Sequence, residues 1–179
     1  MIPTPTRQGR RTTVPARKRA PLNDLEARAW MRFTKSWFVC NPPRRSRTEL
    51  AHPAKFPEAV AREFVEFFTR PGEVVLDPFC GVGSTLAAAT ACGRQAIGIE
   101  LQPEFAAIAR ERGSGHVIAG DARAVVALCR AAGIARVDYV LTSPPYWDML
   151  RHSRGNVHSV HRRRRDRGLP TCYSDDPRD

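Results

Sequence analysis

From residue 57 to residue 141, short apolar segments alternate with longer segments whose apolar residues recur at helical spacing. The apolar segments have the length of buried strands: residues 73–77, 95–100, 116–119 and 137–141. The helical segments between them each stop at a glycine: Gly93, Gly113 and Gly133. Such alternation implies parallel strands joined by crossover helices. We therefore expect an α/β fold, a Rossmann-like doubly wound and mostly parallel sheet.

Two further helical segments precede the first strand. Pro57 and Glu58 suit the first turn of a helix that should end near Thr69, with its apolar stripe formed by Val60, Phe64, Phe67 and Phe68. Residues 22–38 could hold a short helix followed by an extended segment. We predict three regions: a disordered basic tail (1–20), a core (21–150) and a basic, loop-rich C-terminal segment (151–179).

The charge of the chain is unevenly distributed. The net charge is +11, but residues 1–50 carry 12 basic and 3 acidic side chains, residues 51–150 carry 9 and 11, and residues 151–179 carry 8 and 4. A slightly acidic core thus lies between two basic flanks. Clustered cations such as those at residues 162–165 neutralise phosphates and release counterions, so a polyanionic partner is expected. Solvated, disordered arms are the alternative interpretation of the flanks.

The cysteines and the hydropathy favour a cytoplasmic protein. The five cysteines are odd in number and never form C-x-x-C, so neither a disulfide framework nor a metal site is indicated. No apolar run approaches the roughly 20 residues needed to span a bilayer, and the arginine-rich start lacks the apolar stretch of a secretory signal. We expect a soluble protein without a membrane partner.

The turn after the first predicted strand reads Asp-Pro-Phe-Cys-Gly-Val-Gly-Ser from Asp77 to Ser84. Gly81 and Gly83 would let the backbone approach a ligand closely. The following helix should be opened by Ser84 or Thr85. A phosphate site at the start of this helix is the generic alternative. No lysine follows the glycines, however, and Asp77 would repel phosphate. A cationic or hydroxyl-rich ligand fits better, and S-adenosylmethionine offers a sulfonium, an ammonium and a ribose diol.

Acidic residues follow the next two strands as well. Glu100 ends the second strand, where a carboxylate could accept both ribose hydroxyls, as in dinucleotide folds. Asp121 follows the third strand and could accept a hydrogen bond from the adenine amino group, although it is also a plausible helix cap. Together with Asp77, these acids would line one edge of the sheet.

The fourth predicted strand ends in Ser143, Pro144, Pro145 and Tyr146. This turn resembles the catalytic loop of the amino-group DNA methyltransferases, whose target, an exocyclic aromatic amine, is a poor nucleophile because its lone pair is delocalised into the ring. The Ser143 hydroxyl and the Pro144 carbonyl could accept hydrogen bonds from its protons, and tandem prolines would hold these acceptors in place. Tyr146 would offer a stacking face for a base flipped from the duplex. A surface turn is the alternative for such a tetrapeptide in isolation.

These two turns together resemble the cofactor loop and the catalytic loop of the amino-group DNA methyltransferases, which methylate cytosine N4 or adenine N6. The resemblance implies S-adenosylmethionine as cofactor and double-stranded DNA as partner. It implies cofactor-binding roles for Asp77, Phe79, Gly81, Gly83, Ser84, Glu100 and Asp121, and catalytic roles for Ser143, Pro144, Pro145 and Tyr146. The segment from His52 to Pro57 resembles the one that helps hold the methionine end of the cofactor, through His52 and Lys55. Its alternative is a proline-punctuated loop.

Several functions stay open at this point. Serine at position 143 leans toward cytosine N4 over adenine N6. C5-cytosine methylation is disfavoured because it needs a cysteine nucleophile, usually after proline, and no Pro-Cys pair occurs. RNA guanine-N2 methyltransferases share similar turns, and an inactive DNA-binding fragment is also conceivable. Full family members continue through further strands and a target-recognition region, so we expect a truncated enzyme that needs a missing C-terminal half or a complementing subunit.

Overall fold

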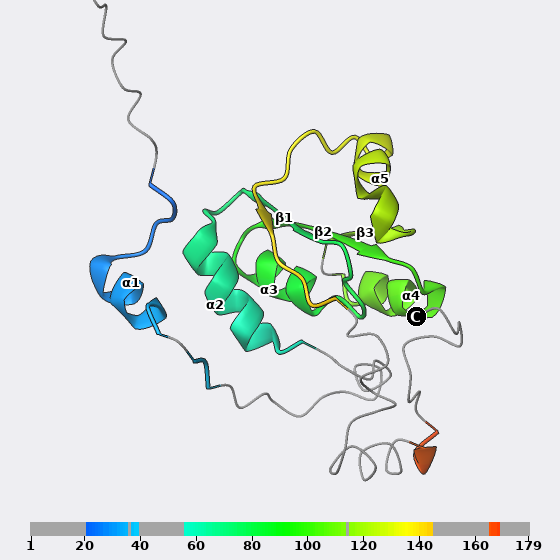
Figure 1. Cartoon of the computed structure of the whole chain (residues 1–179), viewed down its shortest axis with the longest axis horizontal. Coiled ribbons are helices and arrows are strands. Elements are labelled where there is room, and N and C mark those ends of the chain that lie inside the picture. Colours follow the sequence, from blue (N-terminus) through cyan, green and yellow to red (C-terminus); the bar gives the residue numbers. More distant parts are fainter. Residues whose placement is uncertain (1–20, 36, 40–55, 114, 145–164, 169–179) are drawn as a thin grey trace, which may run out of the picture.

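The computed structural model describes residues 21–35, 37–39, 56–113, 115–144 and 165–168. Its strands form one parallel sheet in the order β3-β2-β1-β4 (Figure 1). The strands are β1 (Val74–Asp77), β2 (Gln95–Glu100), β3 (His116–Ala119) and β4 (Tyr139–Val140). The helices are α1 (Ala27–Phe33), α2 (Glu58–Phe68), α3 (Ser84–Ala91), α4 (Pro103–Glu111), the short 3₁₀ helix η1 (Ala122–Ala124) and α5 (Val125–Ala131). The predicted parallel α/β fold is confirmed.

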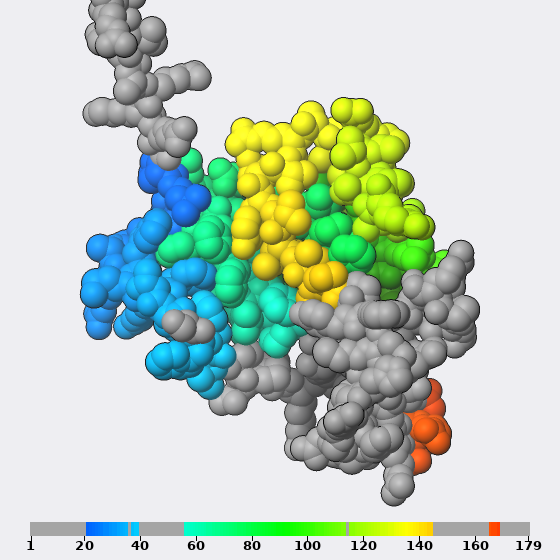
Figure 2. All heavy atoms as spheres, viewed as in Figure 1, coloured from blue at the N-terminus to red at the C-terminus, as the bar shows by residue number. Residues whose placement is uncertain are grey.

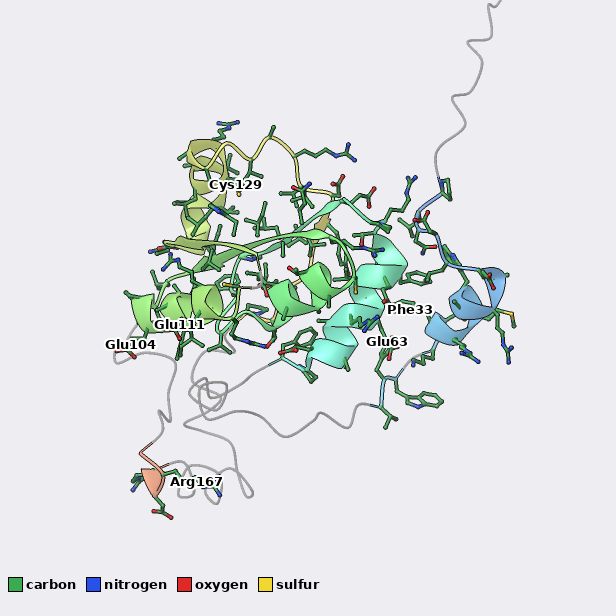
Figure 3. All side chains as sticks on the ribbon, turned by 180° about the vertical axis from the view of Figure 1, so that it is seen from behind. Phe33, Glu63, Glu104, Glu111, Cys129 and Arg167 are labelled. Carbon is green, nitrogen blue, oxygen red and sulfur yellow. The ribbon has the colours of Figure 1, made fainter. Side chains whose placement is uncertain are left out.

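Helices cover both faces of the sheet, because successive strand residues point to opposite sides. On one face, Val75 packs with side chains of α2, α3 and α4, including Val65, Leu86 and Ala109. On the other face, Leu76 packs with residues of α5 such as Cys129. Figure 3 shows Cys129 and the labelled residues of α4 on opposite sides of the sheet. The two apolar clusters make the sheet doubly wound.

The order of the strands creates a switch point beside β1. From β1 the chain moves to β2 and then β3 on one side, and returns through α5 to place β4 on the other side of β1. In open α/β sheets, ligands bind at such a point, outside the carboxyl ends of the strands. Residues 141–144 follow β4 at this edge, and in Figure 2 the yellow segment that contains them lies across the front of the molecule.

An aromatic cluster attaches α1 to α2. The Phe33 ring stacks on Phe67 at 3.9 Å between centroids, and Phe68 in turn stacks on Tyr139 of β4 at 5.3 Å. Asn23 is buried, donates to the Phe67 carbonyl and accepts from the Trp30 indole at 2.9 Å. The predicted stripe on α2 is therefore only partly right. Phe67 is buried with Ala61 and Val65, whereas the other aromatic rings of the stripe complete the contact with α1 and β4.

Two details differ from the sequence expectation. The helix α3 is capped by Gly83 rather than by Ser84 or Thr85, because Gly83 adopts φ +83° and both hydroxyl residues lie inside the buried first turn. The strand β4 has two paired residues instead of five. No helix in the described part of the chain is long and apolar enough to cross a membrane.

Gly98 lies where the turn from Asp77 to Ser84 packs closely on the sheet. It pairs with Asp77 in the β1–β2 register, and a Cβ there would lie 2.6 Å from the Cys80 Sγ and 2.9 Å from a methyl of Leu86. We expect Gly98→Ala to lower the free energy of unfolding by about 1–3 kcal/mol in urea denaturation, because overpacking forces neighbours to shift. Cys80→Ala in that background should recover part of the loss. An unchanged midpoint would contradict this packing.

Candidate functional site

The carboxyl ends of β1 and β4 are joined by a hydrogen bond between side chains. The Thr142 hydroxyl donates to Asp77 Oδ1 at 2.6 Å, and the Phe79 amide donates to the same oxygen at 3.0 Å. Asp77 is only 3% exposed. The bond connects the residue that opens the glycine-bearing turn with the residue immediately before Ser143. The two segments singled out from the sequence therefore meet at the switch point.

Glu100 occupies the end of the neighbouring strand and supports the same turn. One of its oxygens accepts from the Gly81 amide at 2.8 Å, and the other accepts from the Gln102 amide at 2.9 Å. Its side chain is largely buried. Glu100 thus has a structural role in addition to the ligand role expected from the sequence. Each carboxylate oxygen keeps lone pairs for a further donor, because it can accept more than one hydrogen bond.

Both carboxyl groups are buried, and burial of a carboxyl group changes its pKa. Burial raises the pKa of Asp77, while hydrogen bonds from Thr142, Thr85 and Phe79 oppose the rise. Burial also raises the pKa of Glu100, and the charge of Asp77 raises it further. In the part of the chain that the structure describes, no lysine or arginine forms an ion pair with either carboxyl group. A cationic or hydroxyl-rich ligand would offset this unfavourable burial of charge.

The glycine-bearing turn is fixed by backbone contacts. The Cys80 amide donates to the Ile99 carbonyl at 3.0 Å, and the Gly83 amide donates to the Cys80 carbonyl at 2.8 Å. Gly81 and Gly83 both have positive φ, which glycine adopts without strain. A Cβ on Gly83 would meet Ala109 of α4 at 3.3 Å, so Gly83 also serves the packing of α4. Phe79 is 42% exposed at the rim, where its ring is free to contact a ligand.

Asp121 lies past the end of β3 and is engaged locally. It caps η1 by accepting from the Arg123 amide at 2.8 Å, and its other oxygen accepts from the Arg123 guanidinium at 2.8 Å. These hydrogen bonds hold the pKa of Asp121 below its usual range. The helix-cap alternative thus describes the geometry of Asp121. The ligand role of this residue stays a prediction.

Ser143 and Pro144 follow β4 at the same edge of the sheet, with Ser143 partly buried and Pro144 exposed. Pro145 and Tyr146, like His52 and Lys55, lie outside the described residues. Thr142 is the residue at this edge to which sequence reasoning gave no role. One sequence feature could have indicated a role for Thr142: it directly follows an apolar strand and directly precedes Ser143. In a parallel sheet, such a residue lies beside the carboxyl end of the neighbouring strand.

Comparison with known proteins identifies the family. A family model described as DNA methylase, for N6- and N4-methyltransferases, matches residues 9–111, which is more than half of the chain. The chain belongs to this family of S-adenosylmethionine-dependent DNA amino-methyltransferases. The match includes Asp77, both turn glycines and Glu100.

Individual relatives cover shorter regions. The orphan methyltransferase M.BamHII of Bacillus amyloliquefaciens is 34% identical over 85 residues, which are 46% of this chain and 32% of that protein. The DNA adenine methyltransferase YhdJ of Escherichia coli K12 is 44% identical over 54 residues, 30% of this chain and 18% of that protein. The chain thus spans a third or less of the length of these relatives.

Among solved structures, TTHA0409 of Thermus thermophilus, assigned as a DNA modification methylase and complexed with S-adenosyl-L-methionine, is 36% identical. The aligned part covers 54% of this chain and 39% of that chain, with a TM-score of 0.43.

The raised pKa of Asp77 predicts a stability that depends on pH. A carboxyl group whose pKa is higher in the folded protein stabilises the fold most below its unfolded pKa of about 4, and this contribution is lost as the pH rises through the raised value. At pH 7, Asp77→Asn should therefore raise the melting temperature, and the gain should shrink as the pH approaches 4. Calorimetric melts across this range test the expectation. A variant that is less stable than the wild type at pH 7 would contradict it.

Removing the hydroxyl of Thr142 should have the opposite effect. Thr142→Val keeps the shape of the side chain but leaves the buried Asp77 carboxyl without one of its donors, so we expect a loss of about 1–3 kcal/mol in unfolding free energy. Thr142→Ser retains the donor and serves as the matched control. In the Asp77→Asn background, the cost of Thr142→Val should be smaller. Equal costs in both backgrounds would show that the hydrogen bond contributes nothing.

Proposed function

We propose that this chain binds S-adenosylmethionine at the carboxyl edge of its sheet and serves the transfer of a methyl group to an exocyclic amine in double-stranded DNA, with cytosine N4 as the favoured target. The observation that carries the proposal is the hydrogen bond between Thr142 and Asp77. This bond holds the turn from Asp77 to Ser84, which we assign to the cofactor, next to the turn that begins at Ser143, which we assign to the target amine.

The described residues fit the cofactor by charge and by hydrogen-bonding capacity. Asp77 and Glu100 present two buried carboxyl groups at neighbouring strand ends, without a basic partner among the described residues, and such groups favour a ligand with positive charge and hydroxyl donors. The exposed Phe79 ring offers an apolar surface beside them. Gly81, Gly83 and Ser84 would complete this side of the site, and we assign His52, Lys55 and Asp121 to it on the resemblance alone. When bound, S-adenosylmethionine supplies an electrophilic methyl group on a sulfonium.

The catalytic part of the proposal rests on the Ser-Pro-Pro-Tyr turn. Ser143 would accept a hydrogen bond from the target amine through its hydroxyl, and Pro144 would accept through its carbonyl, which favours a nucleophilic nitrogen. Pro145 would restrict the backbone, and Tyr146 would stack on the flipped base. Because Thr142 is held by Asp77, the start of this turn is fixed relative to the cofactor side.

The distribution of charge supports DNA as the partner. Some core arginines are used internally: Arg94, for example, donates to the Thr69 hydroxyl at 2.9 Å and to its carbonyl at 2.7 Å. The two flanks carry most of the excess positive charge of the chain, and we assign phosphate contacts to their basic residues. We keep the cytoplasmic location expected from the sequence, because an enzyme that acts on DNA must share a compartment with its substrate.

The exposed edge of the sheet supports a partner for this chain. Among the described residues, β4 pairs with β1 alone, and Val140 is 51% exposed. Open strand edges are usually covered or paired in stable proteins. The chain also spans a third or less of the named relatives. We infer that further strands, from a C-terminal half or a complementing subunit, pair beside β4 and complete the wall around the target base.

Adenine N6 is the second candidate target, favoured by the similarity to YhdJ. The methylated nucleoside that forms shows whether cytosine or adenine is the target. Duplex DNA incubated with the protein and labelled S-adenosylmethionine should yield N4-methylcytosine on nucleoside analysis by mass spectrometry, at a low rate with this chain alone and at a higher rate once a complementing C-terminal half is added. In the complemented enzyme, Ser143→Ala should reduce the rate by about a hundredfold, as the loss of one preorganised polar group does in other enzymes.

Binding of the cofactor is measured separately by calorimetry. We expect the wild-type chain to bind S-adenosylmethionine and Glu100→Ala to bind at least about tenfold more weakly. Ser143→Ala should bind the cofactor as the wild type does, which makes it the matched control. Absence of binding by the wild type, or a product methylated at cytosine C5 or in RNA only, would overturn the proposed function.

A further inference from the structure

We infer that Arg112 is a positioning residue for the cofactor loop, and that it couples this loop to the start of α2. Arg112 follows α4 and lies far from Asp77 in the sequence. Its side chain is 19% exposed. One end of its guanidinium donates to the Val82 carbonyl at 2.6 Å, and the other donates to Glu58 Oε1 at 2.5 Å. The inference rests on the proposed function, because it concerns how the same site is held.

The helix α4 directs Arg112 toward the loop. Ala109 and Arg112 are three residues apart and therefore lie on the same side of the helix. Ala109 is fully buried and is the residue that a Cβ on Gly83 would meet. Gly113 follows with φ +63° and ends the helix, so that Arg112 is the last side chain on this side. Because Ala109 is small, α4 can approach the loop closely, and the longer side chain of Arg112 extends past Ala109 to reach the Val82 carbonyl.

The contact with Val82 fixes a single peptide unit at both of its ends. The carbonyl of that unit accepts from Arg112, and its amide, which belongs to Gly83, donates to the Cys80 carbonyl at 2.8 Å. Since the peptide is planar, the arginine holds the orientation of this amide and closes the turn from Cys80 to Gly83. Glu100 secures the preceding amide of Gly81. Arg112 thus supports the loop at a second backbone group, two peptide units after the amide that Glu100 holds.

The contact with Glu58 extends this support to a second segment. Glu58 is in the first turn of α2, directly after Pro57. The segment that ends at Pro57 is the one that resembles the part of the family holding the methionine end of the cofactor. A planar guanidinium bridges two acceptors in fixed geometry, which a lysine ammonium does not. Arg112 therefore sets the position of the loop relative to the start of α2.

The test compares Arg112 with Arg110, which lies in the last turn of α4. Arg110 also makes two hydrogen bonds to a carbonyl, at 3.3 Å and 3.1 Å, but its acceptor is Val117 of β3 and not the cofactor loop. Arg112→Gln should weaken S-adenosylmethionine binding in calorimetry by about tenfold or more. Arg110→Gln should change it by no more than about twofold. Arg112→Lys should fall between Arg112→Gln and the wild type, because it keeps a single donor for Val82.

A second readout does not depend on the cofactor. In hydrogen exchange, the Gly83 amide should exchange faster in Arg112→Gln than in the wild type and should be unchanged in Arg110→Gln. Equal effects of the two glutamine variants on binding, or an unchanged Gly83 amide, would overturn the role of Arg112. If Arg112→Gln does not fold, Arg112→Lys decides by the same comparisons. If the wild type fails to bind S-adenosylmethionine, the proposed function fails, while the exchange of Gly83 still decides the role of Arg112.

Discussion

The arrangement of this protein depends on an acidic side chain buried at the end of a central parallel strand. Asp77 has no basic partner among the described residues and is held by donors from its own turn, from α3 and from Thr142. Burial of a carboxyl group is unfavourable for folding, and hydrogen bonds from several donors offset part of this cost. The same burial makes the group effective for a cationic ligand. Stability and binding therefore oppose each other at this position.

The topology gives this carboxyl group its neighbours. Because β4 returns to the free side of β1, two loops that are distant in the sequence come to the same edge of the sheet. One carries the turn from Asp77 to Ser84, and the other begins at Thr142. Glu100 and Arg112 then support the first loop at two backbone groups, by a carboxylate on the Gly81 amide and a guanidinium on the Val82 carbonyl. The site is thus held by side chains from β1 and β2 and by residues that follow α4 and β4.

Much of this arrangement could be predicted from the sequence, since the period of apolar residues and the glycine stops define the strands and helices. The acids at strand ends could be placed on one edge for the same reason. Thr142 and Arg112 could not be assigned, because their partners depend on strand order and on the approach of α4. The cap at Gly83 was missed since serine and threonine are commoner caps, and only the positive φ of the turn requires glycine there. The helix-cap geometry of Asp121 could be predicted, because its partner Arg123 is only two residues away in the sequence.

The central claim is that the cofactor is held between the ends of β1 and β2, beside the loop that begins at Thr142. A crystal structure of the chain with S-adenosylmethionine tests it most directly. The account predicts ligand density at this edge, in contact with Asp77 and Glu100 and open toward Ser143. Density at another edge of the sheet, or a bound ligand that touches neither carboxyl group, would contradict it.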